Sequence, residues 1–205
     1  MKVLLINGSP RHDGNTNRAL EEVAAQLKQH GIESSILWIG VKAVQGCISC
    51  GRCRELGRCA FNDKVYNEVR AELETADALI VGSPTYYGGP NGMLCALLDR
   101  LFYSSQKHLQ NKVWAAVTIC RRGGSTAAFQ RLNMYADMSN MIHATSQYWN
   151  IAFGGSRGEV SLDPEGMQTM RTLADNVAWL LNCTAHRKQE IENRHEITWT
   201  NFIRH

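Results

Sequence analysis

Short aliphatic runs alternate with amphipathic segments along most of the chain. Residues 2–7 form one such run, which stops at Gly8, and this pattern is typical of a strand buried on both faces of a parallel sheet. Residues 15–30 then place apolar side chains at helical spacing, and Gly31 ends that helix. The same reasoning predicts strands at 2–7, 32–39, 78–81, 113–119 and 147–153, and helices at 15–30, 64–75, 92–103, 125–138 and 164–181.

The predicted strands and helices alternate along the chain, without an internal repeat. Because a helix that joins two parallel strands crosses one face of their sheet, this order predicts an α/β fold: a doubly wound five-stranded parallel sheet in flavodoxin-like order. Residues 40–63 are rich in Cys and Gly and would form a long inserted loop. A loop of this length in a compact domain usually has a function.

We expect one domain and a C-terminal extension. All predicted strands and helices fall within residues 1–184, and a chain of 205 residues suits a single domain. Residues 185–205 are charged, yet they include Trp199, Phe202 and Ile203 near the end. Since full solvation would expose these apolar side chains, the extension is expected to pack on the surface or on a neighbouring subunit.

Charge and hydropathy exclude two classes of partner. The chain has 22 Lys and Arg against 19 Asp and Glu, a formal net charge of +3 and no basic block, so we expect no nucleic-acid partner. No apolar run reaches the ~20 residues of a membrane span, and the first run is too short for the core of a signal peptide. These features predict a cytoplasmic protein without a membrane partner.

The loop at residues 8–17 is the first candidate site. In an open α/β sheet, ligands bind beyond the carboxyl ends of the strands, where this loop lies. Gly8 and Gly14 permit close backbone approach, the helix that follows offers free N–H groups, and Arg11 adds a charged fork of donors. The loop lacks both the dinucleotide and the nucleoside-triphosphate glycine patterns, which indicates a terminal monophosphate. An ordinary strand-to-helix turn is the competing interpretation.

A second candidate segment follows the third predicted strand, which should lie beside the first. Backbone amides of residues 85–88 can hydrogen-bond a flat aromatic ring, and Tyr86 and Tyr87 can stack on it. Two tyrosines packed in an ordinary turn would explain the aromatic side chains. They would not explain a second Gly-rich break at the same edge of the sheet.

Together these two segments resemble a known family. Gly8-Ser9-Pro10-Arg11 with Gly14-Asn15-Thr16, and Ser83-Pro84-Thr85-Tyr86-Tyr87-Gly88, look like the flavin-binding loops of the NADPH-dependent FMN reductase family, which includes iron-sulfur flavoproteins. The resemblance covers about residues 1–183. It implies that the FMN phosphate is bound by Ser9, Arg11, Asn15, Thr16 and Asn17, and the flavin ring by Pro84, Thr85, Tyr86, Tyr87 and Gly88.

Four of the seven cysteines, Cys47, Cys50, Cys53 and Cys59, form a Cys-x2-Cys-x2-Cys-x5-Cys run. Three thiolates this close can bind three corners of a [4Fe-4S] cluster, with Cys59 closing the fourth. The spacing also resembles that of iron-sulfur flavoproteins, whereas structural zinc more often uses two separated Cys-x2-Cys pairs. Free cysteines in a loop that shapes the rim of the site or a subunit interface are the competing interpretation.

Several remaining apolar side chains are expected to pack. Cys95 and Cys183 fall on predicted helix faces and are expected to be small core residues. Met134, Met138 and Met141 lie at near-helical spacing and should also contribute to packing.

We therefore predict an FMN-dependent oxidoreductase that takes electrons from NAD(P)H and passes them to a quinone, flavin, nitro or azo compound, or protein. Because the flavin supplies the hydride chemistry, no catalytic side chain is expected. An electron-carrying iron-sulfur flavoprotein is one alternative, and a flavin-bound regulatory or interaction module is another. The resemblance also implies a homodimer or homotetramer.

Overall fold

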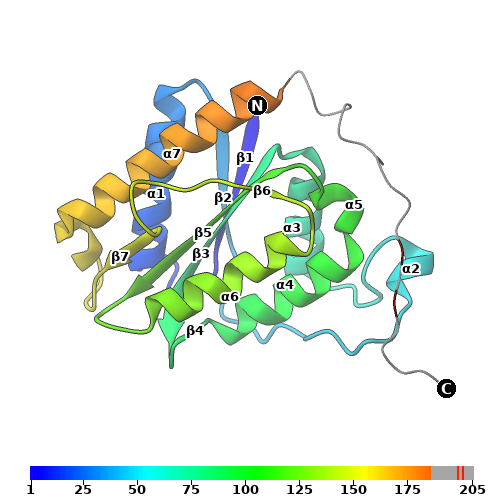
Figure 1. Cartoon of the computed structure of the whole chain (residues 1–205). Helices are drawn as coiled ribbons and strands as arrows, with labels where there is room; N and C mark the ends of the chain where they lie inside the picture. Colours follow the sequence, from blue (N-terminus) through cyan, green and yellow to red (C-terminus); the bar gives the residue numbers. More distant parts are fainter. Residues whose placement is uncertain (186–197, 199, 201–205) are drawn as a thin grey trace.

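The computed structural model, which describes residues 1–185, 198 and 200, contains a sheet in the order β2-β1-β3-β5-β6 (Figure 1). Neighbouring strands along this path are parallel, as the sequence predicts. In addition, β7 pairs parallel with β5, and the short β4 pairs antiparallel with β3. The strands are β1 (Lys2–Asn7), β2 (Glu33–Trp38), β3 (Ala78–Tyr86), β4 (Gly89–Pro90), β5 (Val113–Cys120), β6 (Ile142–His143) and β7 (Ile151–Phe153).

Helices cover both faces of this sheet (Figure 1). One hydrophobic core packs α1 and α7 on the sheet, and the other packs α3, α4 and α6 on the opposite face. The predicted loop at 40–63 contains one short helix, α2. The helices are α1 (Asn15–Gln29), α2 (Cys53–Leu56), α3 (Lys64–Thr75), α4 (Gly92–Ser104), α5 (Gln106–Leu109), α6 (Ser125–Asp137), α7 (Pro164–Thr184) and the 3-10 helix η1 (Glu159–Leu162).

The strand β1 belongs to both cores. Val3 and Leu5 point into the core formed with α1 and α7, whereas Leu4 and Ile6 point into the other. All four side chains are fully buried. Burial of a side chain of this size contributes about 1.5–3 kcal/mol, so the aliphatic run places β1 in the middle of the molecule.

The fifth strand differs from the prediction for residues 147–153. Only β7 forms there, while β6 pairs with the first part of β5 instead. The Ser146 hydroxyl donates to the Tyr148 carbonyl at 2.7 Å and to Asn150 Oδ1 at 2.8 Å. These local bonds hold residues 146–150 in a turn, because a short polar side chain that bonds nearby backbone competes with strand pairing.

Three side chains expected in the core are exposed, so that expectation was wrong for them. Met134 on α6, Met138 directly after α6 and Cys183 on α7 face outward, whereas Met141 is buried and Cys95 is half-buried. Met134 and Cys183 each follow a buried leucine by two positions. Two residues correspond to about 200° around a helix, which turns the side chain to the opposite face.

The C-terminal expectations are not tested. α7 ends at Thr184, and Trp199, Phe202 and Ile203 lie outside the described residues. Among the described helices, none is both long and apolar enough to cross a membrane.

Close backbone approach at Gly8 yields a stability prediction. Gly8 N donates to the Gly82 carbonyl at 2.9 Å, and a Cβ on Gly8 would lie 2.5 Å from Leu94 Cδ2 and 2.8 Å from that carbonyl oxygen. We expect Gly8→Ala to lower the free energy of unfolding by about 1–3 kcal/mol, measured by urea denaturation. Gly92→Ala is the matched control because no atom lies within 4 Å of its added Cβ. Equal stability of the two variants would contradict this account of the packing.

Candidate functional site

A cleft of about 250 Å³ opens at the carboxyl ends of β1, β3 and β5. Its walls come from the loop after β1, the end of β3, the end of β5 and the loop after β7. The lining residues are Ser9, Arg11, Gly14, Asn15, Thr16, Pro84, Thr85, Tyr86, Ile119, Cys120, Arg121, Gly154 and Gly155. The two segments singled out from the sequence therefore meet in one cleft.

The loop after β1 is braced from below by Asn7, whose side chain is fully buried. Asn7 Nδ2 donates to the His12 carbonyl at 3.0 Å and to Asn17 Oδ1 at 3.1 Å, and its Oδ1 accepts from Ser9 N at 3.0 Å. From the side, Trp38 Nε1 donates to the Ser9 carbonyl at 2.7 Å. The loop is thus held in shape by the protein itself, which lowers the entropy lost when a ligand binds.

This loop leads into α1 with donors available for an anion. Gly14 is the N-cap of α1 and has no side-chain cap hydrogen bond, so the first-turn N–H groups are not occupied by a cap. The exposed Arg11 lines the same part of the cleft. Free N–H groups at a helix N-terminus next to a guanidinium suit a phosphate group.

A wall that the sequence analysis missed follows β7. Asn15 Nδ2 donates to the Ser156 carbonyl at 2.8 Å, and Asn15 Oδ1 accepts from Val160 N at 3.3 Å, so Asn15 joins α1 to this segment. The Glu159 carboxylate accepts from Gly155 N at 2.7 Å and from Ser156 N at 2.6 Å, and these two bonds hold the pKa of Glu159 below its usual value. The Gly154-Gly155 pair, directly after a strand, was the available signal.

The end of β3 carries a buried polar atom that lacks a partner within the described residues. Thr85 Oγ1 is buried and makes no hydrogen bond there, and Thr85 lines the cleft. A buried hydroxyl left without a partner is destabilising by about 1–3 kcal/mol, so such groups are rare unless a ligand or water satisfies them. The observation fits a bound molecule with a polar atom at this wall.

Three of the ten residues assigned to the flavin do not line the cleft. Asn17 bonds instead with Asn7 and donates to Glu21 Oε1 at 2.7 Å. Tyr87 and Gly88 form the tip of the hairpin between β3 and β4, with φ values of 50° and 78°. Two successive positive φ values are typical of a tight hairpin turn, and this turn leaves Tyr87 fully exposed.

A second, smaller pocket of about 20 Å³ lies beside α4 and is lined by all four clustered cysteines. Cys47 and Cys50 are exposed, and Cys53 and Cys59 are half-buried. Within residues 1–185, no three Cys, His, Asp or Glu side chains are close enough together to hold a metal ion. The four cysteines thus line one pocket, but within the described residues their thiols do not close around a common centre. The donor set itself, four sulfur atoms within thirteen residues, fits an iron-sulfur cluster.

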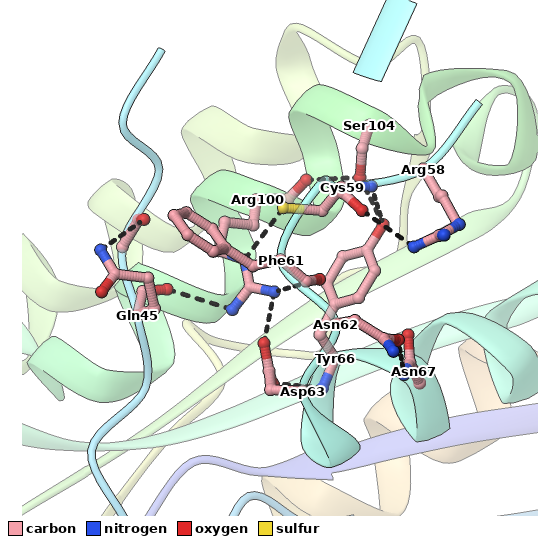
Figure 2. A network of polar contacts seen from close by, with 11 residues as sticks. Gln45, Arg58, Cys59, Phe61, Asn62, Asp63, Tyr66, Asn67, Arg100 and Ser104 are labelled. Carbon is pink, nitrogen blue, oxygen red and sulfur yellow. Dashed lines mark hydrogen bonds and ion pairs between the residues drawn. The ribbon is translucent and has the colours of Figure 1, made fainter. Parts of the chain in front are cut away.

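Arg100 of α4 connects this pocket to the chain around it (Figure 2). Its Nε donates to Cys59 Sγ at 3.3 Å, and its two terminal nitrogens donate to the Gln45 and Phe61 carbonyls, both at 3.2 Å. Asp63 adds an ion pair at 2.5 Å. Burial alone would lower the pKa of the Arg100 guanidinium, but the bonds to Cys59 and Asp63 outweigh it and hold that pKa above its usual value.

Comparisons with known proteins identify the family to which a chain with this cleft is similar. Residues 1–156 match the family model for NADPH-dependent FMN reductase. An iron-sulfur flavoprotein of Methanocaldococcus jannaschii is 34% identical over 87% of this chain and 96% of its own. Another, from Methanosarcina thermophila, is 31% identical over 88% of this chain and 95% of its own.

The fold has solved counterparts. A flavodoxin described as WrbA-like, from Agrobacterium tumefaciens, superposes with a TM-score of 0.63 at 21% identity, covering 91% of this chain and 98% of that one. This likeness supports the flavodoxin-like fold and nothing finer. Because the family model spans most of the chain and the archaeal relatives align over nearly their full length, the chain belongs to the NADPH-dependent FMN reductase family of FMN-binding, flavodoxin-like oxidoreductases.

Proposed function

We propose that the cleft binds FMN and that the chain uses it to take electrons from NAD(P)H and pass them to an acceptor. The observation that carries this proposal is that seven of the ten residues assigned to FMN line one cleft. The acceptor would be a quinone, flavin, nitro or azo compound, or a redox protein. When bound, FMN accepts a hydride from a nicotinamide and returns the two electrons together or singly.

The residues of the chain divide by their part in binding. The braced loop and the start of α1 would hold the phosphate, with Ser9, Arg11 and Thr16 supplying donors. The end of β3 would hold the ring, where the Thr85 hydroxyl would gain the hydrogen-bond partner that it lacks among the described residues. Tyr86 and Tyr87 are exposed near this end, which leaves an accessible face for nicotinamide and acceptor in turn.

The cysteine pocket favours a second activity, electron transfer through a [4Fe-4S] cluster. All four cysteines of the run line this pocket, and relatives that align over most of the chain are named iron-sulfur flavoproteins. We propose that Cys47, Cys50, Cys53 and Cys59 hold the cluster, which carries single electrons when bound. With a cluster at this site, we expect the electron acceptor to be a protein that takes up one electron at a time.

We also propose a cytoplasmic location and assembly into a homo-oligomer. All seven cysteines are free, which supports a reducing, cytoplasmic compartment. Tyr103 on α4, Met134 on α6 and Met138 at the C-terminal end of α6 are exposed apolar side chains on neighbouring helices. We propose that they contribute to a homodimer or homotetramer.

A substitution at Thr85 should affect FMN affinity and protein stability differently. We expect Thr85→Val to weaken FMN about 3- to 10-fold, because one hydrogen bond to the ligand is lost. The FMN-free protein should be as stable as wild type or more so, since an unsatisfied group is removed. Flavin fluorescence titration and thermal unfolding measure the two effects. Thr126→Val, at an exposed site outside the cleft, should change neither.

The identity of the cofactor is a separate prediction. Heat-released cofactor should be FMN and not FAD, because the cleft has one phosphate-binding loop that ends on a helix N-terminus. Arg11→Ala should weaken FMN about 10- to 100-fold through the loss of a charge-assisted contact. FAD in the released fraction, or no flavin uptake from excess FMN, would refute the proposal.

The cysteines separate the two activities. Cys50→Ser should remove iron and the iron-sulfur absorption from anaerobically prepared protein, while NADPH oxidation with menadione continues, because hydride transfer to flavin needs no cluster. Reduction of a one-electron protein acceptor should fall. Cys183→Ser, exposed on α7 and outside the pocket, is the matched control. Wild-type protein without iron would sink the cluster proposal and leave the reductase proposal standing.

A further inference from the structure

The guanidinium of Arg100 is buried at a position where α4 faces the loop at residues 40–63, which carries the four clustered cysteines and is called the cysteine loop below (Figure 2). Its side chain has no exposed surface, whereas its ion-pair partner Asp63 is 38% exposed. A buried cation is strongly unfavourable unless charge and hydrogen bonds compensate it. The Asp63 carboxylate and the carbonyls of Gln45 and Phe61 supply part of this compensation.

The third nitrogen of the Arg100 guanidinium, Nε, is directed at a sulfur atom. Nε lies 3.3 Å from Cys59 Sγ. Among the described residues, Cys59 is the one member of the four-cysteine run whose sulfur accepts a hydrogen bond from a cationic side chain. The arrangement therefore distinguishes the Cys59 corner of the pocket from the other three.

Two aromatic rings keep the Arg100 guanidinium in one orientation. Its central carbon lies 4.7 Å from the centre of the Tyr66 ring and 5.5 Å from that of Phe61, which are cation–π distances. Tyr66 is itself fixed, since its hydroxyl accepts from Cys59 N at 2.9 Å and lies 2.6 Å from Ser104 Oγ. The backbone of Cys59 is thus bound by Tyr66, and its sulfur atom is bound by Arg100.

A purely structural role would explain only part of this geometry. Bonds to the Gln45 and Phe61 carbonyls are enough to fasten the loop to α4. A neutral polar side chain could supply the same attachment between the cysteine loop and α4 as the bond from Nε to Cys59 Sγ. The guanidinium also places a permanent positive charge against a sulfur atom, where burial reduces screening by solvent.

We propose that Arg100 is a positioning residue for the cysteine pocket, which orients Cys59 Sγ as a ligand and raises the reduction potential of the cluster held there. The inference rests on the cluster part of the proposed function. Addition of one electron makes a four-thiolate cluster more negative by one charge, so a buried guanidinium beside it favours the reduced form. Hydrogen bonds to ligand sulfur atoms act on the potential in the same direction.

The test compares wild type with Arg100→Gln, Arg100→Lys and Arg58→Gln after anaerobic reconstitution with iron and sulfide. Arg58 is the matched control: it is an exposed arginine of the same loop that donates to the Cys59 carbonyl at 3.3 Å and makes no bond to the sulfur. Three quantities are measured, namely iron per chain, the rate of iron loss to a chelator, and the midpoint potential from an EPR-monitored titration. FMN uptake reports on folding, because its cleft lies away from Arg100.

We expect Arg100→Gln to lose iron about 10- to 100-fold faster than wild type and to have a lower midpoint potential. Arg100→Lys should also lose iron faster, because one ammonium group cannot replace Nε and both terminal nitrogens together. If Arg100→Gln does not fold, as judged by its failure to bind FMN, the iron loss and midpoint potential of Arg100→Lys provide the test instead. Arg58→Gln should match wild type within about twofold, as an exposed charge is largely screened.

The outcomes separate this inference from the function on which it rests. Wild type that takes up no iron refutes the cluster proposal and the role of Arg100 with it. Wild type that takes up iron, with wild-type iron loss and potential in both Arg100 variants, refutes the role of Arg100 alone. An equal effect of Arg58→Gln would also refute it, since general loss of positive charge would then be sufficient.

Discussion

Burial of β1 on both faces is the constraint on which the rest of the structure depends. Its side chains alternate between two cores, so the strand must lie in the centre of the sheet, and its carboxyl end must emerge between α1 and α4. There the chain has little room: Gly8 packs against Gly82 and Leu94, and the buried Asn7 side chain holds the turn that follows. The cleft is formed by this turn and by the loops that end the neighbouring strands.

The helix α4 extends the influence of this arrangement to the cysteine pocket. Asn91 caps α4 by accepting from Met93 N and Leu94 N, and Leu94 packs beside Gly8 at the cleft end. Arg100 follows about two turns later, a rise of about 12 Å from the start of the helix. The helix α4 therefore carries both the packing behind the loop after β1 and the guanidinium that contacts Cys59. In the proposed function, α4 would thus support both the flavin cleft and the cysteine pocket.

Much of the fold could be predicted because periodicity reports burial directly. The aliphatic run at 2–7 and the helix at 64–75 were placed correctly to the residue, since each has an unambiguous pattern and a clear end. The fifth strand could not be placed, because the local bonds of Ser146 override the strand tendency of the residues that follow. Met134 was misplaced because near-helical spacing of similar side chains does not identify which face is buried.

The site shows a similar division. Residues in motif loops, such as Ser9 and Thr85, could be found from local sequence, and the family supplies their assignment. The wall at Gly154 was missed: the Gly154-Gly155 pair was a local signal, but its place beside the first loop depends on the bonds from Asn15. Arg100 could not be recognised either, because an arginine within an apolar helix ordinarily extends to solvent, and only the tertiary structure shows it buried against Cys59.

The central claim is that one chain holds a flavin in the cleft and gathers four thiols for a second redox centre. The most direct test is the absorption spectrum of protein purified without oxygen, recorded before and after the cysteine-bound iron is removed by a chelator. The account predicts flavin bands superimposed on a broad iron-sulfur absorption, of which only the flavin bands remain after chelation. A spectrum without flavin bands, even after incubation with FMN, would contradict it.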